Sequence, residues 1–116
     1  LVYAYLPSTV SVRYTDILRG FVAQRCLWQH QAKLEFRSPN LIQYRNDHNL
    51  LVDLKHELEM FETVHLLTKT LNETELGEDK CENLLSVYTN LANVGIVEDA
   101  ELAIVEAWIE DIRRLQ

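Results

Sequence analysis

The sequence of 116 residues predicts a mainly α-helical segment with one or two short strands. Four stretches repeat apolar residues at the i, i+3, i+4 spacing of amphipathic helices. Shorter stretches alternate polar and apolar residues, which is typical of strands with one buried face. The composition, with 47% hydrophobic and 25% charged residues, three Gly and two Pro, is that of a globular protein.

The first 30 residues predict an extended entry followed by a helix. Residues 1–6 form an apolar run too short for periodicity to assign as helix or strand. Residues 9–12 alternate and predict a short strand or an extended entry. A helix is expected over about residues 15–30, with Thr15 as its N-cap and Asp16 at the positive end of its dipole.

The middle of the chain predicts strands and then a long helix. Residues 33–37 alternate and predict a strand, and residues 41–44 predict a second short strand or an extended segment. Asn49 is expected to cap a helix that ends by Asn72. Its apolar side is formed by Leu50, Leu51, Leu54, Leu58, Phe61, Val64, His65 and Thr68.

Two further helices are expected over residues 78–93 and 98–115. The first should bury Leu84, Leu85, Tyr88 and Leu91, and the second a stripe of Leu102, Val105, Ile109 and Ile112 flanked by Trp108. Gly95 between them fits a left-handed C-terminal cap.

The charge divides the chain into two segments. Residues 1–45 carry six basic and two acidic side chains, a net of +4, whereas residues 46–116 carry five basic and sixteen acidic, a net of −11. We therefore expect a basic segment (1–45) that holds the helix of residues 15–30, and an acidic three-helix segment (46–116), within one partial domain. The basic segment either faces phosphates or attracts the acidic segment within one fold.

The same numbers disfavour two classes of partner. The acidic total and the lack of a recognition motif argue against nucleic acid. No apolar run approaches the roughly 18 residues that span a bilayer, so no membrane contact is expected from this segment.

Arg13, Asp16 and Arg19 are three residues apart and therefore line one face of the expected helix, with Gln24 and Arg25 farther along. Arginines around a carboxylate can hold a phosphate or an acidic sugar, because the planar guanidinium binds such anions through two hydrogen bonds. The alternative is a set of salt bridges at the helix start, which contributes little if exposed. Spacing alone favours the salt bridges.

No metal site or catalytic motif is expected within the chain. The histidines His30, His48, His56 and His65 form neither an i, i+4 pair nor the H-E-x-x-H motif, and there is no D-x-D cluster or phosphate-binding glycine loop. Cys26 and Cys81 are predicted to be buried thiols, with a disulfide left open. Asn72 begins an Asn-Glu-Thr sequon and is a candidate for N-glycosylation.

The stretch from Arg13 to Trp28 resembles the STELLO family of glycosyltransferases. The residues that carry the resemblance are Arg13, Asp16, Ile17, Arg19, Phe21, Ala23, Gln24, Arg25, Leu27 and Trp28. Residues 34–39 and 96–112 are similar to later parts of the family pattern, although Ser38 stands where the family has a second Pro.

The resemblance implies that the chain is the C-terminal portion of a larger α/β, GT-A-like glycosyltransferase domain. The parent would lie in the Golgi membrane with this segment on the lumenal side, and would transfer sugar from a nucleotide sugar to a glycan acceptor. Acidic metal-binding residues, and with them any divalent metal, would precede Leu1, so this segment should hold no cofactor and be inactive alone. Arg13, Asp16, Arg19, Gln24 and Arg25 then become candidate substrate-binding residues, with Ile17, Phe21 and Trp28 anchoring their helix.

A second class of function remains open. The chain is alternatively a non-catalytic helical module that binds a protein partner through its acidic segment.

Overall fold

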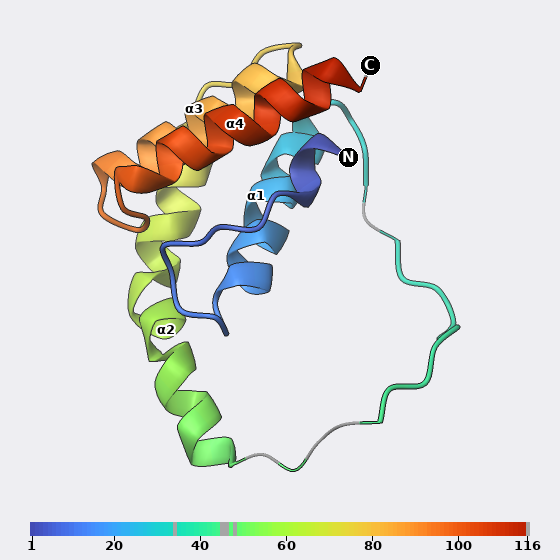
Figure 1. Cartoon of the computed structure of the whole chain (residues 1–116), viewed down its shortest axis with the longest axis vertical. Coiled ribbons are helices and arrows are strands. Elements are labelled where there is room, and N and C mark those ends of the chain that lie inside the picture. Colours follow the sequence, from blue (N-terminus) through green and yellow to red (C-terminus); the bar gives the residue numbers. More distant parts are fainter. Residues whose placement is uncertain (34, 45–46, 48, 116) are drawn as a thin grey trace.

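The computed structural model describes residues 1–33, 35–44, 47 and 49–115. They form a short 3-10 helix, η1 (Val2–Ala4), and four α-helices: α1 (Thr15–Gln29), α2 (Leu50–Glu73), α3 (Lys80–Asn93) and α4 (Ala100–Arg114). Helices α3 and α4 lie side by side, and α1 and α2 run away from them (Figure 1). The predicted mainly α-helical class and all four predicted helices are confirmed.

The described residues contain no strand, so the strand predicted over residues 33–37 is wrong, as is the strand alternative for residues 9–12 and 41–44. Residues 9–12 form bends and a turn, because a carboxylate rather than a neighbouring strand binds the backbone N–H of Thr9. The described parts of residues 33–37 and 41–44 follow a wide arc between α1 and α2 (Figure 1). Phe36 there is 99% exposed. A strand requires a paired neighbour, and no described segment lies beside this arc. Leu34, in the first of these predicted strands, lies outside the described residues.

Side chains cap the starts of α2 and α3 but not those of α1 and α4. Asn49 caps α2 as predicted and accepts a hydrogen bond from the backbone N–H of Leu51 at 2.9 Å. Thr15 is not a cap but the first residue of α1, and its hydroxyl donates to the carbonyl of Val12. Helix α3 begins two residues later than predicted, because Asp79 accepts from the N–H of Cys81 at 2.8 Å and of Glu82 at 2.9 Å.

Gly95 ends α3 in the predicted left-handed conformation, with φ of +75°. The N–H of Ile96 donates to the carbonyl of Leu91, and the N–H of Gly95 donates to that of Ala92, both at 2.9 Å. These two bonds form a Schellman motif, and the burial of Ile96 supplies its hydrophobic contact. The motif turns the chain so that α4 packs back along α3.

One hydrophobic core joins the two segments of opposite charge. The basic segment contributes Val2, Tyr5, Tyr14, Leu18, Val22 and Cys26. The acidic segment contributes Leu67, Leu71, Cys81, Leu84, Val87, Tyr88, Leu91, Ile96, Val97, Val105, Ile109 and Ile112. The predicted inward faces of α3 and α4 are therefore confirmed, with Leu85, Leu102 and Trp108 partly buried against the core.

The apolar side of α2 is present but largely faces solvent. Only the C-terminal part of the helix is buried, through Leu67, Thr70 and Leu71. The first half exposes its large apolar side chains, from Leu50 at 75% to Leu54 at 46%. The reason is length: α2 has 24 residues and α1 has 15, so at 1.5 Å per residue α2 extends roughly 13 Å beyond its neighbour.

Residues 1–12, the N-terminal strap, are fixed to α4 by a buried carboxylate. Glu101 has no exposed surface and accepts hydrogen bonds from the Tyr5 hydroxyl and from the backbone N–H groups of Ser8 at 3.0 Å and Thr9 at 2.8 Å. The indole N–H of Trp108 donates to the carbonyl of Val2 at 3.0 Å. The strap therefore sets where α1 begins, and so where its charged side chains lie.

Candidate functional site

The five candidate substrate-binding residues divide between two grooves on different faces of α1. Arg13, Asp16 and Arg19 line a shallow groove of about 410 Å³, which we call the Arg19 groove. Its other lining residues are Leu6, Val12, Thr15, Ile17 and Glu57. The three-residue spacing thus brings the predicted trio together, and the strap and α2 complete the groove around it.

The charges of the Arg19 groove do not form the expected salt-bridge set. Arg13 pairs with Asp53 of α2 rather than with Asp16. Among the described residues, neither Asp16 nor Arg19 has an ion-pair partner. The half-buried Arg19 therefore keeps its hydrogen-bond donors for another group, next to the carboxylates of Asp16 and Glu57.

Asp53 and Glu57 were missed by the sequence-based reasoning. Both come from α2, some 40 residues after Arg13 and Asp16, and their position depends on how α2 passes the start of α1. The periodicity of α2 predicted its apolar side, but no local pattern indicates which acidic residue lies next to Arg13.

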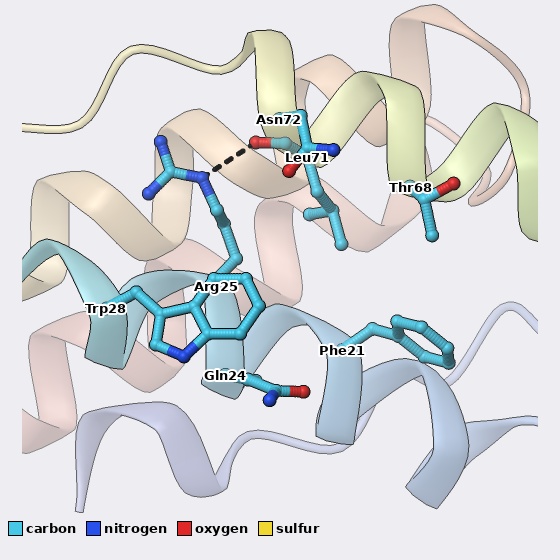
Figure 2. A pocket seen from close by; sticks show the side chains of 7 residues that line it. All are labelled: Phe21, Gln24, Arg25, Trp28, Thr68, Leu71 and Asn72. Atoms are coloured by element: carbon cyan, nitrogen blue, oxygen red, sulfur yellow. Dashed lines mark hydrogen bonds between the residues drawn. The ribbon is translucent and has the colours of Figure 1, made fainter. Parts of the chain in front are cut away.

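Gln24 and Arg25 line a second groove between α1 and α2, with a volume of about 190 Å³ (Figure 2). We call it the Trp28 groove. Phe21, Gln24, Arg25 and Trp28 of α1 form one wall, and Thr68, Leu71 and Asn72 of α2 form the other. Trp28 is 55% exposed here, so its predicted role as an anchor of the helix is wrong. Phe21 and Ile17 are partly buried against the core, as an anchor requires.

Arg25 binds the end of α2. Its Nε donates to the carbonyl of Leu71 and its Nη2 to the carbonyl of Thr74, both at 2.9 Å (Figure 2 shows the first). Carbonyls at a helix C-terminus lack intrahelical partners, and a cation there also suits the helix dipole. Arg25 therefore has a structural role, and substrate binding by it stays a prediction.

Replacing Arg25 with alanine is expected to destabilise the protein by about 1–2 kcal/mol, because two charge-assisted hydrogen bonds are lost. Thermal unfolding of the variant measures this loss. Arg114→Ala is the matched control, since that arginine forms exposed pairs with Glu110 and Asp111 and should matter little. Equal stability of the Arg25 variant and the wild type would contradict the capping role.

The candidate glycosylation site lies on the Trp28 groove. Asn72 is exposed in the last turn of α2 and lines the groove. Thr74 of the sequon is buried, donates its hydroxyl to the carbonyl of Thr70 at 2.8 Å and accepts from the Asn90 amide at 3.0 Å. Thr74 thus helps to close the end of α2 whether or not Asn72 is modified.

Among the described residues, the cysteines and histidines gather in no metal-binding cluster. Cys26 and Cys81 are free, buried thiols, as predicted. Burial raises the pKa of Cys26 to about 11, so this thiol stays protonated and is a poor nucleophile at neutral pH. His30 lies 3.3 Å from the Tyr3 hydroxyl, and His48 lies outside the described residues. Within the described part of the chain, no three His, Cys, Asp or Glu side chains gather as metal ligands.

The helices that line both grooves lie in a region that matches a known family. The family model of the STELLO glycosyltransferases matches residues 13–116. The chain belongs to the STELLO glycosyltransferase family. The match begins at Arg13, the first residue of the motif, and covers α1 to α4. The resemblance inferred from Arg13 to Trp28 is therefore confirmed.

Other comparisons add no further relative. Neither the curated proteins nor the solved structures yield a match. Among the described residues of this STELLO chain, no helix combines the length and the apolar composition needed to cross a membrane.

Proposed function

We propose that this STELLO segment is the helical part of a larger α/β, GT-A-like domain that transfers sugar from a nucleotide sugar to a glycan acceptor in the Golgi lumen. In this proposal the Arg19 groove faces the ligand. One observation carries it: within the family-matched region, Arg19 is half-buried beside a groove and has no ion-pair partner among the described residues.

The chemistry of the groove suits an anionic or hydroxyl-rich ligand. The guanidinium of Arg19 offers a planar set of N–H donors, which match two oxygens of a diphosphate or of an acidic sugar. Negative charge develops on the diphosphate as a sugar leaves it, and a positioned cation stabilises that charge. The Asp16 carboxylate accepts hydrogen bonds, as a sugar hydroxyl requires.

Arg13 and Asp53 have a positioning role in this proposal. Their ion pair joins the start of α1 to α2, and Arg13 of the pair lines the groove. The pair neutralises Arg13, so the positive charge that remains for a ligand is that of Arg19. Gln24 and Arg25 line the other groove and are not needed for this contact.

The described residues do not fit a divalent metal, because they bring no three ligating side chains together. We place any divalent cation of the parent on residues that precede Leu1 and derive no step through it. Consistent with this division, we expect the 116-residue segment alone to be inactive.

Arg19→Ala in the full-length parent is expected to lower kcat/KM for nucleotide-sugar consumption by about 10- to 100-fold, because a charge-assisted contact to the ligand is lost. Arg19→Lys should recover only part of the activity, since it keeps the charge and loses the planar donors. Arg114→Ala is the surface control. Unchanged turnover in the Arg19→Ala variant would refute the site.

The alternative function is a non-catalytic helical module that binds a protein partner. One observation favours it: a groove between α3 and α4 has Leu85 and Ile109 in its lining, together with Glu82, Glu106 and Glu110. Such a groove suits a basic amphipathic segment. The experiment above separates the two functions, because the module predicts no effect of Arg19→Ala on any activity of the parent.

A further inference from the structure

We propose that Asn72 carries an N-linked glycan whose first N-acetylglucosamine packs in the Trp28 groove. The chain is then the acceptor of a sugar, in addition to any sugar transfer that its family performs. The proposal rests on the lumenal location proposed above and not on the Arg19 groove, which lies on another face of α1.

Three features of the groove carry the proposal. Asn72 is exposed, begins the Asn-Glu-Thr sequon and lines the groove itself, so a sugar on its Nδ2 starts at the wall (Figure 2). Across the gap lies Trp28, a large aromatic side chain that remains 55% exposed. The volume of about 190 Å³ suits one sugar ring and leaves the rest of a glycan in solvent.

The lining matches the two kinds of surface on a sugar ring. A pyranose has apolar C–H faces and a polar rim of hydroxyl groups, and N-acetylglucosamine adds an acetamide. Trp28, Phe21 and Leu71 provide apolar surface for the C–H face and the acetamide methyl. Gln24 and Thr68 provide an amide and a hydroxyl for the polar rim.

The covalent step needs a second substrate of defined chemistry, an oligosaccharide linked to a lipid diphosphate, and the transferase of the secretory pathway. The Asn72 amide nitrogen forms a bond to C1 of the first sugar. The bond from C1 to the diphosphate oxygen breaks, and the lipid diphosphate leaves with the electron pair. The amide nitrogen gives up one proton to a base, and no group is oxidised or reduced.

The fold determines whether Asn72 is glycosylated before or after α3 packs against α2. A sequon needs its threonine hydroxyl as well as its asparagine. In the folded chain the Thr74 hydroxyl is buried and bonded to Thr70 and to Asn90 of α3. Asn72 is therefore modified before α3 packs against α2, and the sugar enters the groove as the helices come together.

The test uses the full-length parent purified from a eukaryotic host. Peptide mass mapping should find the glycan on Asn72, and Asn72→Gln should lack it. In a host that keeps its glycans in the oligomannose form, endoglycosidase H leaves one N-acetylglucosamine on Asn72, whereas the Asn72→Gln protein carries none. The protein with one sugar should melt about 2–4 °C above the protein without it, as expected for a contact at one aromatic side chain.

The variants Trp28→Ala and Trp28→Leu test whether the Trp28 groove causes the rise in melting temperature. Both should fold, because Trp28 is largely exposed, and both should abolish the difference in melting temperature between the proteins with and without the sugar. Unmodified Asn72 in the purified protein would overturn the proposal. A difference that persists in both Trp28 variants would also overturn it, since the sugar would then stabilise the protein without this groove.

Discussion

Glu101→Ala is expected to destabilise the folded chain by about 3–5 kcal/mol, which is much of the stability of a small domain. The substitution leaves the backbone N–H groups of Ser8 and Thr9 and the hydroxyl of Tyr5 without their acceptor. It also leaves a cavity where the buried side chain packed. The N-terminal strap should then detach from α4, and Tyr5 should lose its edge-to-face contact with Tyr88, whose ring centre lies 5.1 Å away.

Denaturant unfolding followed by circular dichroism measures this effect. The matched control is Tyr88→Phe in the same core, because the Tyr88 hydroxyl is buried and has no hydrogen-bond partner in the described part of the chain. Its removal should change stability little. A loss below about 1 kcal/mol for Glu101→Ala would show that the strap is not held by this carboxylate.

Acidification should weaken the same anchor. Burial opposes ionisation of Glu101, but hydrogen bonds from Tyr5, Thr9 and Ser8 outweigh it and hold the pKa of Glu101 below its ordinary value of 4.5. The unfolded chain therefore binds the proton more readily than the folded chain. The contribution of Glu101 to stability is complete above pH 4.5 and is lost as the pH falls through the folded pKa. Glu101→Gln should remove this part of the pH dependence.

The Glu101→Gln variant should still lose some stability in acid, because Asp79 also contributes to the pH dependence of stability. Hydrogen bonds from the backbone of Glu82 and Cys81 lower the pKa of Asp79, so its contribution has the same sign. A Glu101→Gln variant with the same pH dependence of stability as the wild type would contradict the assignment of Glu101 as the main titrating anchor.

The acidic segment, residues 46–116, is expected not to fold cooperatively when produced alone. Without the basic segment it loses the buried side chains Tyr5, Tyr14, Leu18 and Val22, which exposes the inner faces of α3 and α4. Glu101 would also lose the Tyr5, Ser8 and Thr9 donors that join it to the strap. Although the charge pattern divides the chain at about residue 45, the core does not.

Calorimetric unfolding of residues 46–116 and the dispersion of their amide proton chemical shifts test this prediction. Residues 1–116 serve as the control. The isolated segment should show no cooperative transition, and the full segment should show one. A sharp transition for residues 46–116 alone would mean that the basic segment is an addition to an independent domain. It would also favour the alternative function as a separate binding module.

The helices were predictable from sequence because their signals are local. Asn49 lies before an apolar repeat and accepts from the next N–H groups, and Gly95 supplies the positive φ that ends α3. The stripe of Val105, Ile109 and Ile112 is buried as its spacing predicts. Each of these features depends on residues within a few positions of one another.

The failures concern partners far away in the sequence. Alternation over residues 33–37 and 41–44 indicates a strand only when another strand pairs with it, and no described segment does. The apolar side of α2 was visible in the sequence, but its exposure follows from how far α2 extends beyond α1. Periodicity identifies an amphipathic side and says nothing about what covers it.

The candidate site was predictable only where it depends on residues close together in the sequence. Helical spacing placed Arg13, Asp16 and Arg19 together, and the family pattern selected them. Spacing could not show that Arg13 pairs with Asp53 and that Arg25 binds the end of α2, since both contacts join residues more than 35 positions apart. These contacts leave Arg19 as the arginine that carries the proposal.

Binding of nucleotide sugars to the full-length parent tests that proposal most directly. Isothermal titration should compare the wild type, Arg19→Ala and Arg114→Ala with uridine, guanosine and cytidine nucleotide sugars. The structure predicts that a sugar nucleotide bound by the wild type binds Arg19→Ala at least about 10-fold more weakly and Arg114→Ala equally well. Equal affinity of the wild type and Arg19→Ala would contradict it.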